Sequence, residues 1–188
     1  MQKIMFNDRY GLTQAVIEGR KTMTRRLINL NSTSDVQVRI FAGYVQIIGR
    51  SGNVCVEKKL SYKVGEIVAV AQNYSSFYNI LDNTRLIPEG AGWDNKMFVR
   101  ADLMPHRIRI TGIKCERLQD IQDADCLKEG VRYIPKINKF YFEGVRREEG
   151  FYFDNHREAF AALIDKVSGR GTWASNPWVV VYEFELVK

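Results

Sequence analysis

Apolar and polar residues alternate over much of this chain, and this pattern predicts more strand than helix. Strands are expected over Lys3–Phe6, Val36–Leu60, Ile67–Ala71, Arg107–Thr111 and Val179–Leu186. The second of these ranges is long and contains a Ser-Gly-Asn turn, so we interpret it as an antiparallel meander. The fourth alternates arginine with isoleucine, which is typical of a sheet with one buried and one solvated face.

Helical spacing of apolar residues occurs in three shorter stretches. The first predicted helix covers Arg9–Glu18, with Asp8 as its N-cap. The second covers Leu118–Glu129, ends at Gly130 and has a buried stripe made of Ile121, Ala124 and Leu127. The third begins at a capping box formed by Asn155 and Glu158, has an apolar stripe and ends at Gly169.

The order of these elements does not alternate strand with helix, so a doubly wound parallel sheet is not expected. Two runs, Phe140–Phe142 and Phe151–Phe153, have the same Phe-Tyr-Phe sequence and flank a polar turn. We interpret them as a hairpin with aromatic pairs, although stacking platforms for bases have a similar composition. The pattern as a whole predicts an α+β domain around a curved or barrel-like sheet.

Composition and charge narrow the class of protein. The chain has 188 residues, 45% hydrophobic and 27% charged, which is typical of one folded domain. Its net charge of +6 favours an acidic partner, although proteins without such a partner also carry an excess of this size. The cysteines and histidines lack metal-ligand spacing, so neither a metal nor another cofactor is expected. An odd number of cysteines fits a reducing cytoplasmic compartment, and no apolar run approaches membrane-spanning length.

The most unusual stretch is Gly19–Arg26, which places four cations and two threonines in eight residues. Cations this close together repel one another unless an anion, a carboxylate or water compensates them, which makes a phosphate-bearing partner a reasonable expectation. A solvated basic loop is the alternative. Gly19 is suited to end the preceding helix, and Lys21 and Thr24 share a face only if the turn is helical.

Four stretches together resemble the ASCH domain family. The sequence Glu18-Gly19-Arg20-Lys21-Thr22-Met23-Thr24-Arg25-Arg26 resembles that family's Gly-x-Lys-x-x-Thr/Glu-x-Arg signature. The other three stretches are similar to its Val-Gly-Asp strand start, its second helix and its closing Asn-Pro-x-Val strand; they are Val64–Val70, Leu118–Val131 and Asn176–Glu185. All four occur in the family's order and span nearly the whole chain.

This resemblance implies a PUA-like fold, in which a small mixed β-barrel with about three flanking helices carries a basic cleft. Residues 1–188 would then form a single domain with insertions around 73–96 and 132–155. ASCH domains are proposed to bind RNA, and some members are N4-acetylcytidine amidohydrolases. The resemblance places that enzyme's three functional residues at Lys21, Thr24 and Glu129.

These residues support two different functions. In a hydrolase, a neutral Lys21 would remove the proton of Thr24 as its hydroxyl attacks an amide, and Glu129 would protonate the leaving amine or hold the substrate. In a binding protein, whose ligand would be RNA or a modified nucleoside, the cations would bind phosphate groups. The further candidate binding residues are Arg20, Arg25, Arg26, Gln72, Trp173 and Asn176. A third interpretation is purely structural, and we expect binding before hydrolysis.

Overall fold

A computed structural model describes residues 1–28, 36–78, 90–144 and 152–187, in which ten strands and four α-helices are formed. In chain order these elements are β1 Lys3–Ile4, α1 Leu12–Ile17, β2 Met23–Leu27, β3 Gln37–Phe41, β4 Tyr44–Ile48, β5 Val54–Lys59, β6 Ile67–Val70, β7 Arg107–Arg117, α2 Asp123–Lys128, β8 Arg132–Ile134, β9 Lys139–Tyr141, α3 His156–Ser168, α4 Thr172–Ser175 and β10 Trp178–Val187.

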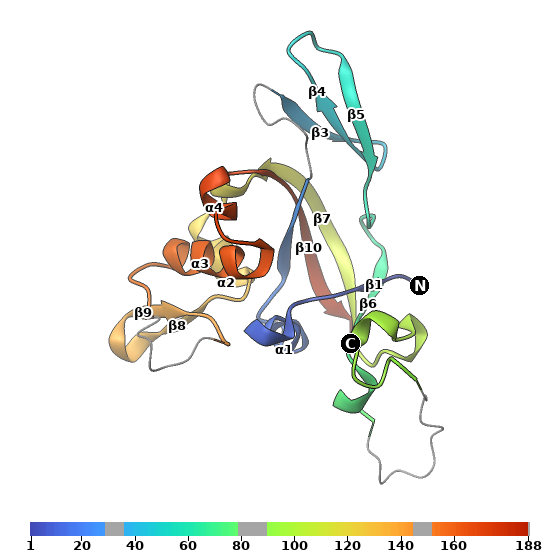
Figure 1. Cartoon of the computed structure of the whole chain (residues 1–188), viewed down its shortest axis with the longest axis vertical. Coiled ribbons are helices and arrows are strands. Elements are labelled where there is room, and N and C mark those ends of the chain that lie inside the picture. The colour runs from blue at the N-terminus through green and yellow to red at the C-terminus, as the bar shows by residue number, and fades with distance from the viewer. Residues whose placement is uncertain (29–35, 79–89, 145–151, 188) are drawn as a thin grey trace.

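The main sheet has five strands in the order β1-β6-β7-β10-β2. Strand β1 pairs with β6 in parallel, and the other neighbours are antiparallel. A second sheet, β3-β4-β5, stands at one end of the molecule, while α2, α3 and α4 lie together on one side of the main sheet (Figure 1). Strand β2 is an edge strand and runs beside these helices. The Gly19–Arg26 stretch, which enters β2 at Met23, therefore lies next to them.

Burial along the central strands follows the alternation in the sequence. In β7, Ile108 and Ile110 are fully buried, whereas Arg107 and Arg109 are exposed. Strand β10 contributes Val179, Val181 and other residues to the same core. Burial of such side chains stabilises the fold by roughly 1.5–3 kcal/mol each. The predicted meander and central strands are therefore confirmed.

The mixed α+β class is confirmed as well. In the described part of the chain, β1 and β2 remain the two edges of the main sheet, so its strand pairings do not close into the expected barrel. The described residues form four α-helices where about three were expected, and α4 is a single turn.

The predicted first helix is divided in two. Gly11 has a left-handed backbone with φ of 62°, so a 3-10 turn over Asp8–Tyr10 precedes α1. Asn7, and not Asp8, caps that turn, because its side chain accepts a hydrogen bond from the amide of Arg9. The prediction for α3 is confirmed: the side-chain oxygen of Asn155 accepts a 2.8 Å hydrogen bond from the amide of Glu158.

The buried face of the second helix differs from the prediction. Helix α2 begins at Asp123 after a separate 3-10 turn, and Gln122 occupies its N-cap without a side-chain hydrogen bond. Ala124 and Leu127 are exposed, whereas the buried residues include Asp125. Ile121 is buried as predicted, but Ala124 and Leu127 are not, because α2 turns Asp125 and Cys126 toward the interior in their place.

The aromatic hairpin is present in part. Residues 145–151 lie outside the described ones, so the pairing of the two Phe-Tyr-Phe runs is described only where Phe140 forms an isolated bridge with Phe153. The rings of Phe142 and Phe153 stack at 6.0 Å between centroids. Strand β9 also pairs with β8, so the first run belongs to a small sheet beside α3. These aromatic residues pack against the core, as the structural interpretation expected.

Candidate functional site

The Gly19–Arg26 stretch is a tight turn that leads into edge strand β2. Gly19 has φ of +72°, and the amides of Arg20 and Lys21 both donate to the carbonyl of Ala15, which ends α1. The amide of Thr22 donates at 3.0 Å to the carbonyl of Lys128 at the end of α2. The turn is therefore fixed between α1 and α2, and the motif becomes extended from Met23 onward.

Lys21 is buried at this junction, with 2% of its surface exposed. Its ammonium donates to the carbonyl of Met23 at 2.7 Å, to the carbonyl of Glu129 at 2.8 Å and to Oε2 of Glu129 at 2.6 Å. A charged ammonium has three N–H donors, and all three are used here. Lys21 therefore joins β2 to the end of α2.

Burial lowers the pKa of Lys21 below its usual value, because the charged form loses its hydration. The carboxylate of Glu129 acts in the opposite direction, and the nearby guanidinium groups of Arg25 and Arg26 again lower the pKa. Since every proton of the ammonium has an acceptor, the resting geometry is that of a charged lysine.

Arg25 is the second buried cation. Its guanidinium contacts Oε1 of Glu129 at 2.9 Å and Oε1 of Glu116 at 2.6 Å, and Oδ2 of Asp125 lies 3.7 Å away. The side chain is only 1% exposed, so it does not reach a phosphate at the surface. The arginine partner of Glu129 is therefore Arg25.

A cavity of about 220 Å³ lies next to this buried charge network. Its polar lining includes Lys21, Thr24, Arg25, Arg26 and Glu129, so the three residues identified by resemblance meet at one place although 108 positions separate Lys21 from Glu129. Its apolar lining comes from the start of the chain, α1, β2 and α3, as Phe6, Leu12, Leu27, Phe160, Leu163, Ile164 and Val167. The cavity is smaller than the 300–1,000 Å³ of typical drug-sized sites.

Thr24 faces this cavity from β2. The residue is buried, and its hydroxyl makes no hydrogen bond to any described residue. A Lys21 base would have to contact this hydroxyl, but the amine is engaged by Met23 and Glu129 instead. The Thr24 hydroxyl is thus available to a ligand and is not paired with a base.

The other two cations of the motif have different surroundings. Arg20 is paired at 2.6 Å with Glu18 and lies 3.8 Å from Glu143. Arg26 is exposed; its guanidinium donates at 2.7 Å to the carbonyl of Met5 and stacks over the ring of Phe6. Arg26 is the cation of this motif that faces outward from the cavity wall without an ion pair among the described residues.

The remaining three candidates lie outside the cavity. The side-chain oxygen of Gln72 accepts a 2.8 Å hydrogen bond from Nδ1 of His106, and Gln72 lines a separate hollow of about 170 Å³. Trp173 does not line the cavity; its ring packs against that of Phe160, with the ring centroids 6.0 Å apart. Asn176 accepts a 2.8 Å hydrogen bond from the amide of Gln119, so its side chain fixes the approach to β10.

Sequence reasoning missed the acidic residues that hold the site together, Glu116 and Asp125. One signal was present for Asp125, because Asp125 and Glu129 are four residues apart and therefore share a helix face. That pair of carboxylates opposite a dense cationic motif indicates a buried charge network. Phe6 and Phe160 had no comparable signal, because only the fold brings them to Lys21.

Comparison with protein-family models, with curated proteins and with solved structures gave no match to this chain. Over residues 1–28, 36–78, 90–144 and 152–187, none of the helices has the length and hydrophobicity that crossing a bilayer requires. The same stretches contain no group of three or more histidine, cysteine or acidic side chains arranged to hold a metal ion.

Proposed function

We propose that this protein binds a pyrimidine base, as part of RNA or of a modified nucleoside, in the cavity lined by Lys21, Thr24 and Glu129. The observation that carries the proposal is the combination of a small apolar cavity with a free hydroxyl and a fixed carboxylate at its polar end. Ligand sites are commonly of this kind, with apolar walls and a few oriented polar groups.

The polar groups match the edge of a cytosine-type base. A carboxylate such as Glu129 accepts a hydrogen bond from an exocyclic amine, and the Thr24 hydroxyl can donate to a ring nitrogen or carbonyl. Lys21 and Arg25 keep Glu129 charged and oriented. The apolar side chains of Phe6 and Phe160 then cover the faces of the base.

Relative affinity for nucleosides tests this proposal. Cytidine should bind at least about fivefold more tightly than uridine, since uridine turns a carbonyl oxygen toward the Glu129 carboxylate where cytidine has an amine. Isothermal titration with both nucleosides measures the ratio. Equal affinities, or no binding of either nucleoside, would reject the assignment of the cavity to a base.

A second candidate function is hydrolysis of an amide on such a base, as in N4-acetylcytidine. The convergence of Lys21, Thr24 and Glu129 and the lowered pKa of Lys21 favour it. The Thr24 oxygen would attack the amide carbonyl while Lys21 takes its proton and passes it through Glu129 to the leaving amine; water would then release the acyl group as acetate. This requires Lys21 to leave its present acceptors, so binding is the function that the resting geometry supports better.

The release of cytidine and acetate from N4-acetylcytidine separates the two functions. If Lys21 is a base, the rate should rise with pH until this lysine is neutral, and Lys21→Arg should abolish turnover because a guanidinium keeps its charge. Thr24→Ser should retain turnover and Thr24→Val should not, since only serine keeps the hydroxyl. A wild-type protein that leaves N4-acetylcytidine intact has no such activity.

We further propose that the chain is an ASCH domain of PUA-like architecture that works in a reducing, cytoplasmic compartment. The support is the order of its four family-like stretches and the position of the signature beside the cavity. The three cysteines are free thiols in the structure, which suits such a compartment.

A further inference from the structure

One face of the β3-β4-β5 sheet carries an exposed row of two aromatic rings and a cation. Phe41 is in register with Tyr44, and Tyr44 is in register with Lys59, so the three side chains lie side by side on one face of the three strands. Phe41 is 60% exposed and Tyr44 38% exposed. Arg39 on β3 places its guanidinium 5.7 Å from the Phe41 ring. Exposed aromatic rings beside cations form stacking platforms for unpaired bases.

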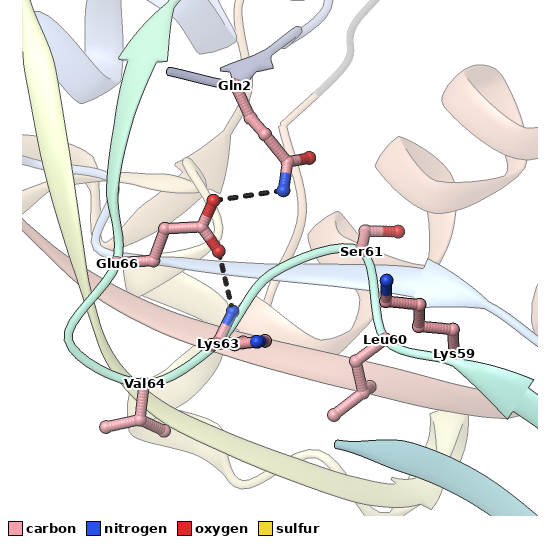
Figure 2. A pocket seen from close by; sticks show the side chains of 7 residues that line it. All are labelled: Gln2, Lys59, Leu60, Ser61, Lys63, Val64 and Glu66. Carbon is pink, nitrogen blue, oxygen red and sulfur yellow. Dashed lines mark hydrogen bonds between the residues drawn. The ribbon is translucent and has the colours of Figure 1, made fainter.

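Lys59, the last residue of this row, also lines an open groove of about 640 Å³. The groove is lined by Lys59 and Lys63 together with Gln2, Leu60, Ser61, Val64 and Glu66 (Figure 2). Glu66 lies across the groove from Lys59, and its carboxylate accepts from the Gln2 side chain at 3.0 Å and from the backbone amide of Lys63 at 2.9 Å. Glu66, the one acidic residue of this lining, thus connects the turn at Lys63 to Gln2, which precedes β1.

The groove adjoins the candidate base cavity through one intervening hollow of about 60 Å³. That hollow shares Lys59, Leu60 and Ser61 with the groove, and it shares Arg26 and Leu27 with the cavity. The three hollows therefore follow one another from the β3-β4-β5 sheet, past the edge strand β2, to Thr24 and Glu129.

Exposed cations that form no ion pair with a described acidic residue line this path. Arg26, Lys58, Lys59 and Lys63 are exposed, and within the described residues none of them forms an ion pair. Cations gathered along one path attract a polyanion, whereas a single bound nucleoside needs none of them. A cavity of about 220 Å³ admits one base and not a duplex, so a base must be unpaired to enter it.

We infer that the partner is single-stranded RNA that crosses the β3-β4-β5 sheet and the groove before it delivers one base to the cavity. Phe41 and Tyr44 stack on bases, and Lys59 and Lys63 contact phosphates. Arg26 contacts the phosphate nearest the cavity mouth. This inference rests on the proposed base-binding function, and it assigns the strand a surface that lies apart from the cavity.

Two double variants test it by fluorescence anisotropy with a labelled single-stranded RNA over a series of salt concentrations. Lys59→Glu/Lys63→Glu should weaken binding at least tenfold at low salt and reduce the log–log salt slope by roughly 1.4, since each single-strand phosphate contact contributes about 0.7. Phe41→Ala/Tyr44→Ala should weaken binding by about fivefold or more per ring at every salt concentration and leave the slope unchanged.

Matched controls carry the same changes elsewhere on the surface. Lys136→Glu/Arg170→Glu makes the same change in net charge at exposed positions outside the groove. Phe98→Ala/Tyr133→Ala removes two exposed rings from other parts of the surface, where these residues are 62% and 45% exposed. Both controls should bind RNA within about twofold of the wild type. Cytidine titration of all four variants should give wild-type affinity, because none of the changed residues lines the cavity.

The outcomes distinguish the proposed path of the RNA from the proposed binding of a base in the cavity. If the groove and sheet variants bind RNA as well as their controls do, the proposed path of the RNA is wrong, while the proposed binding of cytidine in the cavity can still be correct. If RNA binding depends on these residues but the wild type does not bind cytidine, the base-binding function is wrong and the strand surface remains. If the controls weaken RNA binding as much as the test variants, attraction is unspecific and the inference is overturned.

Discussion

The buried ion pair between Lys21 and Glu129 allows a quantitative test of the site's construction. Its atoms are 2.6 Å apart, and the two side chains are 2% and 6% exposed. Glu129→Gln keeps the shape but leaves two buried cations, Lys21 and Arg25, without this counter-charge. Removing one partner of a buried pair typically costs about 3–5 kcal/mol, since the remaining charge stays buried. We expect a loss of that size in the free energy of unfolding.

A double variant shows how much of this loss belongs to the pair. Lys21→Met replaces the ammonium with an apolar group of similar length and leaves Glu129 paired with Arg25. In Lys21→Met/Glu129→Gln both charges are removed, and Arg25 still contacts Glu116 at 2.6 Å. The double variant should therefore be more stable than the sum of the single losses predicts, by at least about 1 kcal/mol.

Urea unfolding followed by circular dichroism measures these values, provided that the dependence on denaturant stays constant among the variants. Glu185→Gln is the control, because its ion pair with Arg109 is exposed and should contribute less than about 1 kcal/mol. Additive losses for Lys21 and Glu129, or a Glu129→Gln variant no less stable than the control, would refute the buried network.

Other expected outcomes concern the scaffold. Gly144→Ala should destabilise the fold by more than about 1 kcal/mol in thermal or urea unfolding, because φ is +80° and a Cβ atom would lie 1.8 Å from the carbonyl oxygen of Arg9; unchanged stability would contradict this packing. Asn155→Ala should cost about 1 kcal/mol by loss of the α3 cap, whereas Asn155→Ser should cost little. In timed thiol labelling at pH 8, exposed Cys55 should react first, while burial raises the pKa of Cys126 to about 11, so that about one thiol in a thousand is ionised; equal rates would contradict this burial.

The strands were predictable because each follows a local rule. Ile108 and Ile110 alternate with arginines, and one buried face is enough to fix that alternation. The start of α3 was predictable for the same reason, since Asn155 and Glu158 form a local cap. The α+β class followed from the order of these elements.

The site itself was not predictable from local rules. Hydrophobic periodicity assigns polar residues to solvent, so it gives no indication that Arg25 and Asp125 are buried. These charges are buried because they neutralise one another across β2, β7 and α2, and such pairing depends on contacts between distant parts of the chain. The positions of Lys21 and Glu129 came from family resemblance and not from spacing.

Binding of cytidine to variants at the mouth of the cavity tests the central claim most directly. Val167 lines the cavity on α3 and is 37% exposed, so Val167→Trp should block the site without destabilising the core. Its neighbour Lys166 is exposed and does not line the cavity, which makes Lys166→Trp the matched control. Isothermal titration should show wild-type affinity for the control, no binding for Val167→Trp and about fivefold to tenfold weaker binding for Thr24→Val, which loses one hydrogen bond. Equal cytidine affinity in all of these proteins would contradict the account.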